Sequence, residues 1–239
     1  DRSCILDPLT QPLPFTPFKD FTGRSINEIN LYSTEMSSAL CSIDRVSASA
    51  KMNNRLSEAI VETYKSTNGA PISFELMLKC YQSRMKDANN DDSISSVLKQ
   101  LVNAHIFESE DKVSLIDDCY IIKMDGYPKD GPIAKAIVYF LMSKLNNIYE
   151  LLDKQAVNDE VVQIRHFSII DEAHYMLDFD NRPLRNLIAV GRNKGLSIIL
   201  ATQNMSSFKS KGFDFYANAQ YPLIMKQQTI DDKVIKDLF

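Results

Sequence analysis

The sequence predicts an α/β fold in which a parallel sheet is covered by helices on both faces. Three apolar stretches have the length and composition of buried strands, over residues 119–124, 161–170 and 196–202. Stretches with helical spacing of apolar residues separate them, over 132–153 and 183–192. Strands that alternate with helices and are apolar on both faces are typical of a parallel sheet buried between helices.

The first part of the chain predicts a strand end, a loop and a long helix. Residues 4–7 form an apolar run that ends in an acid, as at the end of a buried strand. Residues 11–22 predict an ordered surface loop, because they are rich in proline, which disfavours helix and sheet interiors. Residues 27–66 have helical spacing, and Asn68-Gly69 is a typical helix end.

A small helical insert is predicted over residues 70–116. It contains helices over 72–86 and 93–104, with Ser93 as the N-cap of the second. The polar residues 108–112 indicate a turn between two short strands that close the insert.

The predicted organisation therefore has three parts. Residues 1–69 form the N-terminal part of the core, residues 70–116 the insert and residues 117–239 the rest of the core. Near the C-terminus, Leu223–Met225 predicts a further strand and Ile230–Phe239 a last helix.

Composition narrows the functional class. The 239 residues are 44% hydrophobic and 24% charged, which is enough for a globular core. A net charge of −4 gives no whole-domain basic footprint for nucleic acid, although a local basic loop stays possible.

The cysteines are scattered without zinc spacing, as expected of buried reduced thiols in a cytoplasmic protein. No apolar run approaches membrane-spanning length, so no membrane partner is expected. The first residues do not form a signal peptide and read as a cut through a longer protein.

The strongest chemical signal is the pair Asp171 and Glu172 at the end of the predicted strand 161–170. Ligands bind at the carboxyl ends of parallel strands in open α/β sheets. One carboxylate can then hold a magnesium ion through its waters, and the next can act as a base toward an attacking water. The alternative is that both acids merely favour the start of the following helix.

A second signal follows the strand 196–202. Gln203 offers an amide donor and acceptor at the strand end, which suits contact with a phosphate or an attacking water. Arg192 precedes the strand and suits a bidentate phosphate contact, in the same subunit or across an interface. Taken alone, Gln203 is equally a strand-end cap, and Arg192 a solvated charge near a helix C-terminus.

The ordered set of Asp171-Glu172, Gly191-Arg192 and Thr202-Gln203 resembles the C-terminal half of the HerA/FtsK superfamily of hexameric P-loop ATPases, which have a RecA-like core. The resemblance covers residues 119–239 well, and more loosely a family strand and loop over residues 5–18, where Thr16 replaces the usual Asn.

The resemblance implies a cofactor set, roles for residues and partners. ATP and Mg2+ are the implied cofactors, with Asp171 on the magnesium side. Glu172 is the implied catalytic acid and Gln203 the sensor, while Arg192 is the first candidate for an arginine finger and Arg185 the second. The implied partners are DNA and further copies of the chain in a ring, and the family implies a hexamer.

One family motif is missing. None of the seven glycines precedes Lys-Ser or Lys-Thr, so the G-K-[ST] phosphate-binding loop is absent from these residues. Either the loop lies upstream in a longer protein, in which case this fragment alone is inactive, or the domain is a degenerate ATPase. Truncation is the preferred interpretation.

Within the superfamily, the sequence is most similar to the large ATPase of phosphorothioation-dependent DNA restriction, the DptH type. This implies an ATP-hydrolysing motor that acts on DNA as a translocase or helicase in bacterial restriction or defence, with a nuclease or other defence subunits as partners. Two alternatives stay open: a non-catalytic ATPase-like scaffold for such a nuclease, and a conjugation or secretion ATPase.

Two further features are weaker. His174 follows the acids and is interpreted as a packing or polar neighbour. Residues 205–215 include Lys209 and Lys211 with aromatic residues, which could grip a DNA backbone. A solvated connection is the favoured interpretation of that stretch.

Overall fold

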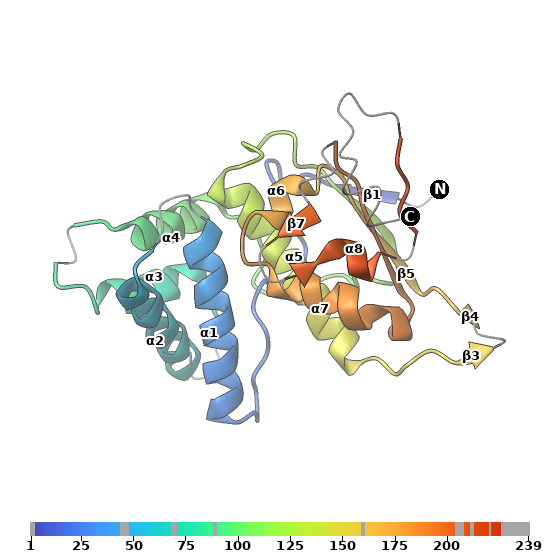
Figure 1. Cartoon of the computed structure of the whole chain (residues 1–239). Coiled ribbons are helices and arrows are strands. Elements are labelled where there is room, and N and C mark those ends of the chain that lie inside the picture. Colours follow the sequence, from blue (N-terminus) through green and yellow to red (C-terminus); the bar gives the residue numbers. More distant parts are fainter. Residues whose placement is uncertain are drawn as a thin grey trace. The chain divides into compact units, whose positions relative to one another are not determined.

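The computed structural model describes residues 3–43, 48–67, 71–87, 90–158, 161–203, 208–210, 213–219 and 221–225 (Figure 1). The chain divides into two compact units, Asp1–Asn147 and Ile148–Phe239, which are described separately below. The three-part organisation expected from the sequence is not tested by this division and stays a prediction.

The first unit contains a group of four helices: α1 (Ile26–Ile43), α2 (Ala50–Ser66), α3 (Phe74–Gln82) and α4 (Ser93–Ala104). The single helix predicted over 27–66 is wrong, because α1 and α2 are separate helices that pack on each other (Figure 1). Ser49 starts α2 as an N-cap, where its side chain accepts the Met52 N–H. Ser37 donates from Oγ to Asn53 Oδ1 over 2.6 Å and links the two helices.

Helices α3 and α4 confirm the two predicted helices of the insert, but the cap of α4 is Asp92 and not Ser93. Asp92 and Ser95 form a reciprocal capping box. The Asp92 carboxylate also accepts from the Tyr81 hydroxyl at 2.7 Å and pairs with Arg55 at 3.1 Å. A carboxylate has the acceptor sites for all three tasks, whereas a serine hydroxyl does not.

The strand pair predicted around residues 108–112 is also wrong. Phe107 instead forms an isolated parallel bridge with Leu13, and the Lys112 N–H donates to the Pro14 carbonyl over 2.9 Å. The predicted loop 11–22 therefore supplies the backbone partner, and its Leu13 and Phe15 are fully buried. Contacts between aromatic rings hold this region together, involving Phe15, Phe18, Phe74, Phe107 and Phe140.

Two predicted strands of the first unit pair in parallel, β1 (Ser3–Leu6) with β2 (Cys119–Ile122), and α5 (Pro132–Leu151) confirms the predicted helix that follows them. Their burial is less complete than expected, since Ile5 and Ile121 are exposed.

The cysteines also depart from the expected burial. Cys80 is buried and Cys41 is half-buried, whereas Cys4 and Cys119 are exposed, and all four thiols are free. Burial raises the pKa of the Cys41 thiol to about 12, so this group stays protonated at neutral pH.

The second unit is built around β5 (His166–Ile170) and β6 (Leu196–Leu200), which pair in parallel. The chain between them forms α6 (His174–Leu177), α7 (Arg182–Val190) and the 3-10 helix η1 (Gly191–Lys194). Short strand pairs flank this core: β3 (Val157–Asn158) with β4 (Val161–Val162), and β7 (Lys209–Ser210) with β8 (Phe213–Asp214), followed by α8 (Phe215–Asn218).

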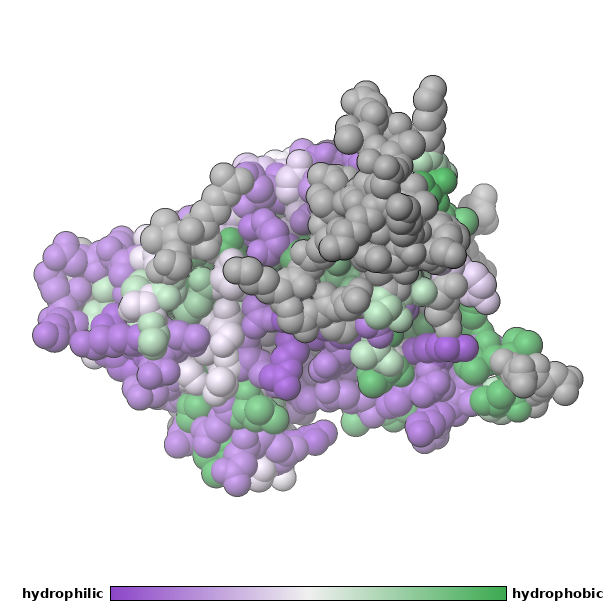
Figure 2. Space-filling view, in the orientation of Figure 1, coloured by the Kyte–Doolittle hydropathy of each residue, from purple (hydrophilic) through white to green (hydrophobic). Residues whose placement is uncertain are grey.

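The predicted strand 161–170 is therefore two strands, since residues 163–165 separate β4 from β5. The strand predicted at Leu223–Met225 is wrong, because these residues have no regular structure and Leu223 is 88% exposed. The helix predicted over 230–239 lies outside the described residues. In Figure 2, apolar surface shows over the β3–β4 hairpin, where Val157 and Val161 are exposed.

One face of the β5–β6 pair is more open than the sequence predicts. Parallel register places Phe167, Ile169 and Ile199 on this face, and all three side chains are about half exposed or more. Burial on both strand faces is thus contradicted for the described residues. Among the described helices, none combines the length and the apolar character needed to cross a bilayer.

Candidate functional site

The two polar strand ends singled out in the sequence meet at one end of the β5–β6 pair. The register pairs Ile170 with Leu200, so the residues that follow each strand emerge side by side. The Ala201 N–H continues the ladder by donating to the Ile170 carbonyl over 2.9 Å. Asp171-Glu172 and Thr202-Gln203 therefore lie together, as the sequence predicts.

Glu172 interrupts the ladder as a one-residue bulge. In a regular parallel ladder, the Ala201 carbonyl would accept from the Glu172 N–H. It accepts instead from the Ala173 N–H over 2.8 Å, and Glu172 adopts a left-handed backbone with φ 50°. The displaced Glu172 N–H donates to Asp171 Oδ1 over 2.9 Å. Such a bulge re-aims a side chain, and here it directs the Glu172 carboxylate toward the end of β6.

The bulge predicts an unusual order of stability between two truncations. A left-handed backbone costs alanine roughly 1–2 kcal/mol more than glycine. We therefore expect the free energy of unfolding, measured by urea denaturation, to be about 1 kcal/mol higher for Glu172→Gly than for Glu172→Ala. Both variants lose the same carboxylate, so each is the control for the other. A more stable alanine variant would contradict the left-handed bulge.

Both oxygens of the Glu172 carboxylate have polar neighbours. Gln203 donates from Nε2 to Oε1 over 2.5 Å, and His174 Nδ1 lies 3.4 Å from Oε2. The same His174 nitrogen lies 3.3 Å from the Thr202 hydroxyl. Sequence reasoning treated His174 only as a packing or polar neighbour, and its spacing two residues after Glu172 was the available signal.

Asp171 is placed differently from Glu172. Its side chain is exposed, and Oδ1 accepts the Glu172 N–H, which leaves Oδ2 available. The described residues contain no group of three or more His, Cys, Asp or Glu side chains suited to a metal ion. The available oxygen of Asp171 is compatible with Mg2+, which protein sites commonly hold through one or two carboxylates, waters and substrate phosphates. The acid side of a Mg–nucleotide site thus fits the residues present.

The arginine candidates are not equivalent to the residues of this strand end. Arg192 lies in η1, before β6, whereas Gln203 follows β6. The strand between them has 5 residues and spans roughly 16 Å. Arg192 therefore cannot contact a group held at Glu172 of its own subunit. Arg185 lies near the start of α7, and its guanidinium is ion-paired with Asp180.

The predicted DNA-gripping stretch is only partly described. Lys209 lies in β7, and Lys211 falls outside the described residues. The DNA contact of this stretch stays a prediction.

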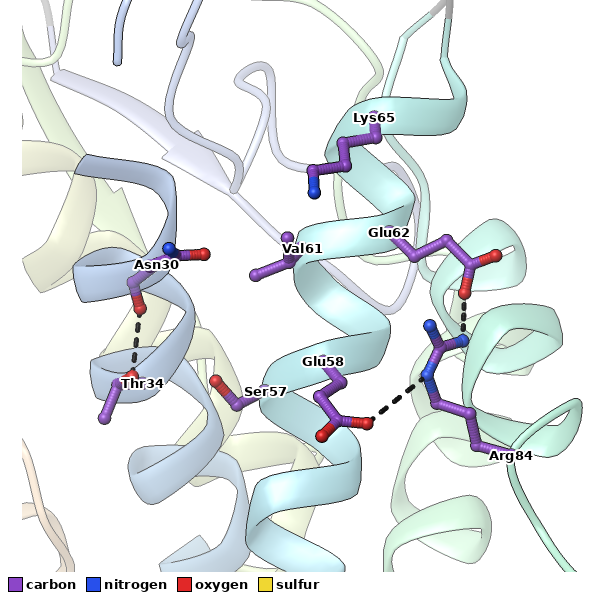
Figure 3. A pocket seen from close by; sticks show the side chains of 8 residues that line it. All are labelled: Asn30, Thr34, Ser57, Glu58, Val61, Glu62, Lys65 and Arg84. Atoms are coloured by element: carbon purple, nitrogen blue, oxygen red, sulfur yellow. Dashed lines mark hydrogen bonds and ion pairs between the residues drawn. The ribbon is translucent and has the colours of Figure 1, made fainter. Parts of the chain in front are cut away.

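A separate cavity of about 550 Å³ lies in the first unit, between α1, α2 and the end of α3 (Figure 3). Arg84 contributes the guanidinium at its wall, and this group is ion-paired with Glu58 and Glu62. Figure 3 shows both acids turned toward Arg84, whose charge is therefore already neutralised by protein carboxylates. None of the predicted site residues lines this cavity, so we do not assign it to the nucleotide.

Comparison with known proteins identifies the fold but no close relative. No protein-family model matches the chain, and no curated protein matches its sequence. Solved structures do match. VirB4 of Thermoanaerobacter pseudethanolicus superposes with a TM-score of 0.53 and 16% identity, over 86% of this chain and 58% of VirB4.

The plasmid coupling protein TrwB, in complex with the ATP analogue ADPNP, superposes with a TM-score of 0.51 and 14% identity, over 90% of this chain and 55% of TrwB. An unbound form of the bacterial conjugative coupling protein TrwB gives 0.52 and 13%, over 87% of this chain and 53% of that one. The chain thus spans a little over half the length of these structures.

These likenesses confirm the fold expected from the sequence. The chain has the mixed α/β, RecA-like fold that it shares with VirB4 and TrwB. At this level of identity the likeness concerns the fold alone. The narrower resemblance to the DptH type stays a prediction.

Proposed function

We propose that the chain forms the catalytic side of a Mg2+-dependent ATPase that drives a motor acting on DNA. The observation that carries the proposal is the contact between the Glu172 carboxylate and the Gln203 amide, beside the available oxygen of Asp171. A base, an amide and a magnesium-side acid at one strand end are the groups that phosphoryl transfer to water requires.

Each residue then has a distinct task. Mg–ATP, when bound, supplies the phosphoryl group and the positive charge that offsets developing negative charge. The available oxygen of Asp171 would help to hold the magnesium ion. Glu172 accepts the proton of the attacking water, and Gln203 orients that water through its remaining donor and its carbonyl.

The proposal requires a phosphate-binding loop from outside these 239 residues. The sequence contains no G-K-[ST] element, and the described acids would repel an unneutralised phosphate. We infer that a further segment of a longer polypeptide supplies the loop, and that these residues alone are inactive.

The position of Arg192 favours a role at the site of a neighbouring subunit. Its position before β6 keeps it away from Glu172 of the same chain, while it is exposed at the surface of the second unit. We propose that it serves the site of a neighbouring copy in a ring, which is a hexamer in this proposal. Arg185 is the second candidate, although Asp180 must release it first.

DNA is the proposed substrate polymer, and restriction in bacterial defence is the proposed process, with a nuclease or other defence subunits as partners in the cytoplasm. Transport in conjugation is a second candidate. It is favoured by the fold shared with a plasmid coupling protein and with VirB4. A non-catalytic scaffold is a third, supported by the missing phosphate-binding loop.

The test uses the natural polypeptide that contains these residues. We expect it to release phosphate from ATP in a Mg2+-dependent manner and to be stimulated by double-stranded DNA. Asp171→Asn should raise the Mg2+ concentration needed for half-maximal turnover about tenfold or more, because a neutral amide binds hydrated Mg2+ less well. Asp153→Asn, which neutralises an exposed acid elsewhere in the second unit, is the matched control.

Three other outcomes are informative. Absence of hydrolysis in the unaltered protein would favour the scaffold. Equal Mg2+ dependence in both variants would remove Asp171 from the site. Hydrolysis without stimulation by DNA would contradict the DNA motor.

A further inference from the structure

We propose that His174 is a positioning residue that donates a hydrogen bond from Nδ1 to Glu172, and that Thr202 holds its ring in place. This inference deepens the proposed function and rests on it for the catalytic consequence. The contact itself depends only on the described geometry.

The geometry surrounds the Glu172 carboxylate on both sides. Gln203 Nε2 contacts Oε1 at 2.5 Å. His174 Nδ1 lies 3.4 Å from Oε2, a buried oxygen, which is longer than an ordinary N–H···O hydrogen bond and closes to one with a small rotation of the ring. An ionised carboxylate has about four acceptor sites, so neither partner uses all of them. The carboxylate can thus be held at both oxygens, and Oε1 is the oxygen that can accept a proton from water, because Oε2 is buried.

The tautomer of His174 follows from its two neighbours. Nδ1 lies 3.3 Å from the Thr202 hydroxyl and 3.4 Å from the carboxylate, and a single ring nitrogen either donates or accepts. If Nδ1 accepted from Thr202, the buried Oε2 would lie 3.4 Å from an unprotonated, electron-rich ring nitrogen, which is repulsive. Hydrogen bonds to an ionised acceptor are the stronger ones, so the Nδ1–H tautomer is favoured.

Two further contacts restrict the ring. The His174 ring packs at a tilt against the neighbouring Tyr175 ring, with ring centroids 4.1 Å apart. The Thr202 hydroxyl, as an acceptor, can share the Nδ1 hydrogen and keep it in the plane of the contact. Thr202 and Gln203 are consecutive residues at the end of β6. This strand end therefore contacts Glu172 directly through Gln203 and, through Thr202, the His174 ring on the other side of the carboxylate.

Amide substitutions test which ring nitrogen acts. Asparagine places its amide nitrogen near the position of Nδ1, whereas glutamine places it near Nε2. We expect His174→Gln to lower the rate of ATP hydrolysis about tenfold to a hundredfold, with ATP affinity unchanged, because Glu172 loses its orientation. His174→Asn should keep the rate within about threefold of the unaltered protein. A purely structural role would make the two variants alike, and equal rates would overturn the proposal.

A second measurement does not depend on activity. Nitrogen chemical shifts of the His174 ring in the same polypeptide report which nitrogen carries the proton. We expect a protonated Nδ1 whose shift changes in Glu172→Ala, and a neutral ring with an unprotonated Nδ1 would overturn the proposal. If the unaltered protein does not hydrolyse ATP, the proposed function fails, and the ring nitrogens still decide whether His174 holds Glu172.

Thr202→Val covers the case in which the His174 variants fail to fold. It keeps the shape of threonine and removes the hydroxyl. We expect slower hydrolysis and a broadened or displaced Nδ1 signal, and unchanged values of both would contradict the role of Thr202.

Discussion

Glu172→Gln is expected to lower the rate of ATP hydrolysis by about a hundredfold to ten-thousandfold, while ATP stays bound. The substitution keeps the length of the side chain and its acceptor toward Gln203, whose Nε2 lies 2.5 Å from Oε1. It removes the basic oxygen that receives the proton of the attacking water. Contacts to the phosphates and to magnesium do not involve this group in the proposal, so the affinity for ATP should change little.

The measurement combines steady-state phosphate release with titration of a fluorescent ATP analogue, in the natural polypeptide that contains these residues. Asp153→Asn controls for the loss of one exposed negative charge. Rates of hydrolysis that are equal in Glu172→Gln and the unaltered protein would exclude Glu172 as the base. Lost nucleotide binding would instead place Glu172 in the binding of the metal.

Gly195→Ala is expected to destabilise the second unit by about 2–5 kcal/mol. Gly195 has φ 81°, a left-handed conformation that an L side chain rarely adopts. A Cβ at this position would lie 2.7 Å from the Gln163 carbonyl oxygen and 3.0 Å from the Arg165 nitrogen, both backbone atoms. Neither atom can move without displacing the chain that enters β5.

Urea denaturation followed by circular dichroism measures this effect. Gly23→Ala is the matched control, because Gly23 also has a left-handed φ of 72° but has open space where a Cβ would lie. We expect the control to cost only the backbone term of about 1–2 kcal/mol. Similar losses in the two variants would show that the close approach of Gly195 to β5 is not a constraint.

Gly195 also links stability to the site. Its carbonyl accepts from the Arg165 N–H at 2.7 Å and the His166 N–H at 3.2 Å, where β5 and β6 begin their register. A displaced register at this end would separate Glu172 from Gln203 at the other. Gly195→Ala should therefore also reduce hydrolysis, even at temperatures where the protein stays folded.

Local patterns predicted the elements whose signals are self-contained. Helix α5 has a proline at its start and a long apolar face, and its bounds differ little from the prediction. The strand β6 is a run of apolar residues bounded by Gly195 and Thr202, and it lies where predicted. In both elements, the structural preference of the local sequence agrees with the tertiary structure.

Predictions failed where the partner of a segment lies far along the chain. Residues 108–112 looked like a hairpin, but the bridge of Phe107 goes to Leu13, almost a hundred residues earlier. The helix expected over 27–66 divides in two, because Ser49 caps α2 and the two helices pack against each other. Helical spacing alone does not show such a break.

For the site, the sequence by itself determined which groups gather at one strand end: Asp171, Glu172 and Gln203 follow two apolar strands, and parallel pairing brings such ends together. Only the tertiary structure decided how they meet. The left-handed bulge at Glu172 turns its carboxylate to Gln203 and His174, and the length of β6 places Arg192 at the opposite end. Spacing along a chain defines neighbours in a strand, whereas a one-residue bulge and the partners it selects arise from hydrogen bonds between strands.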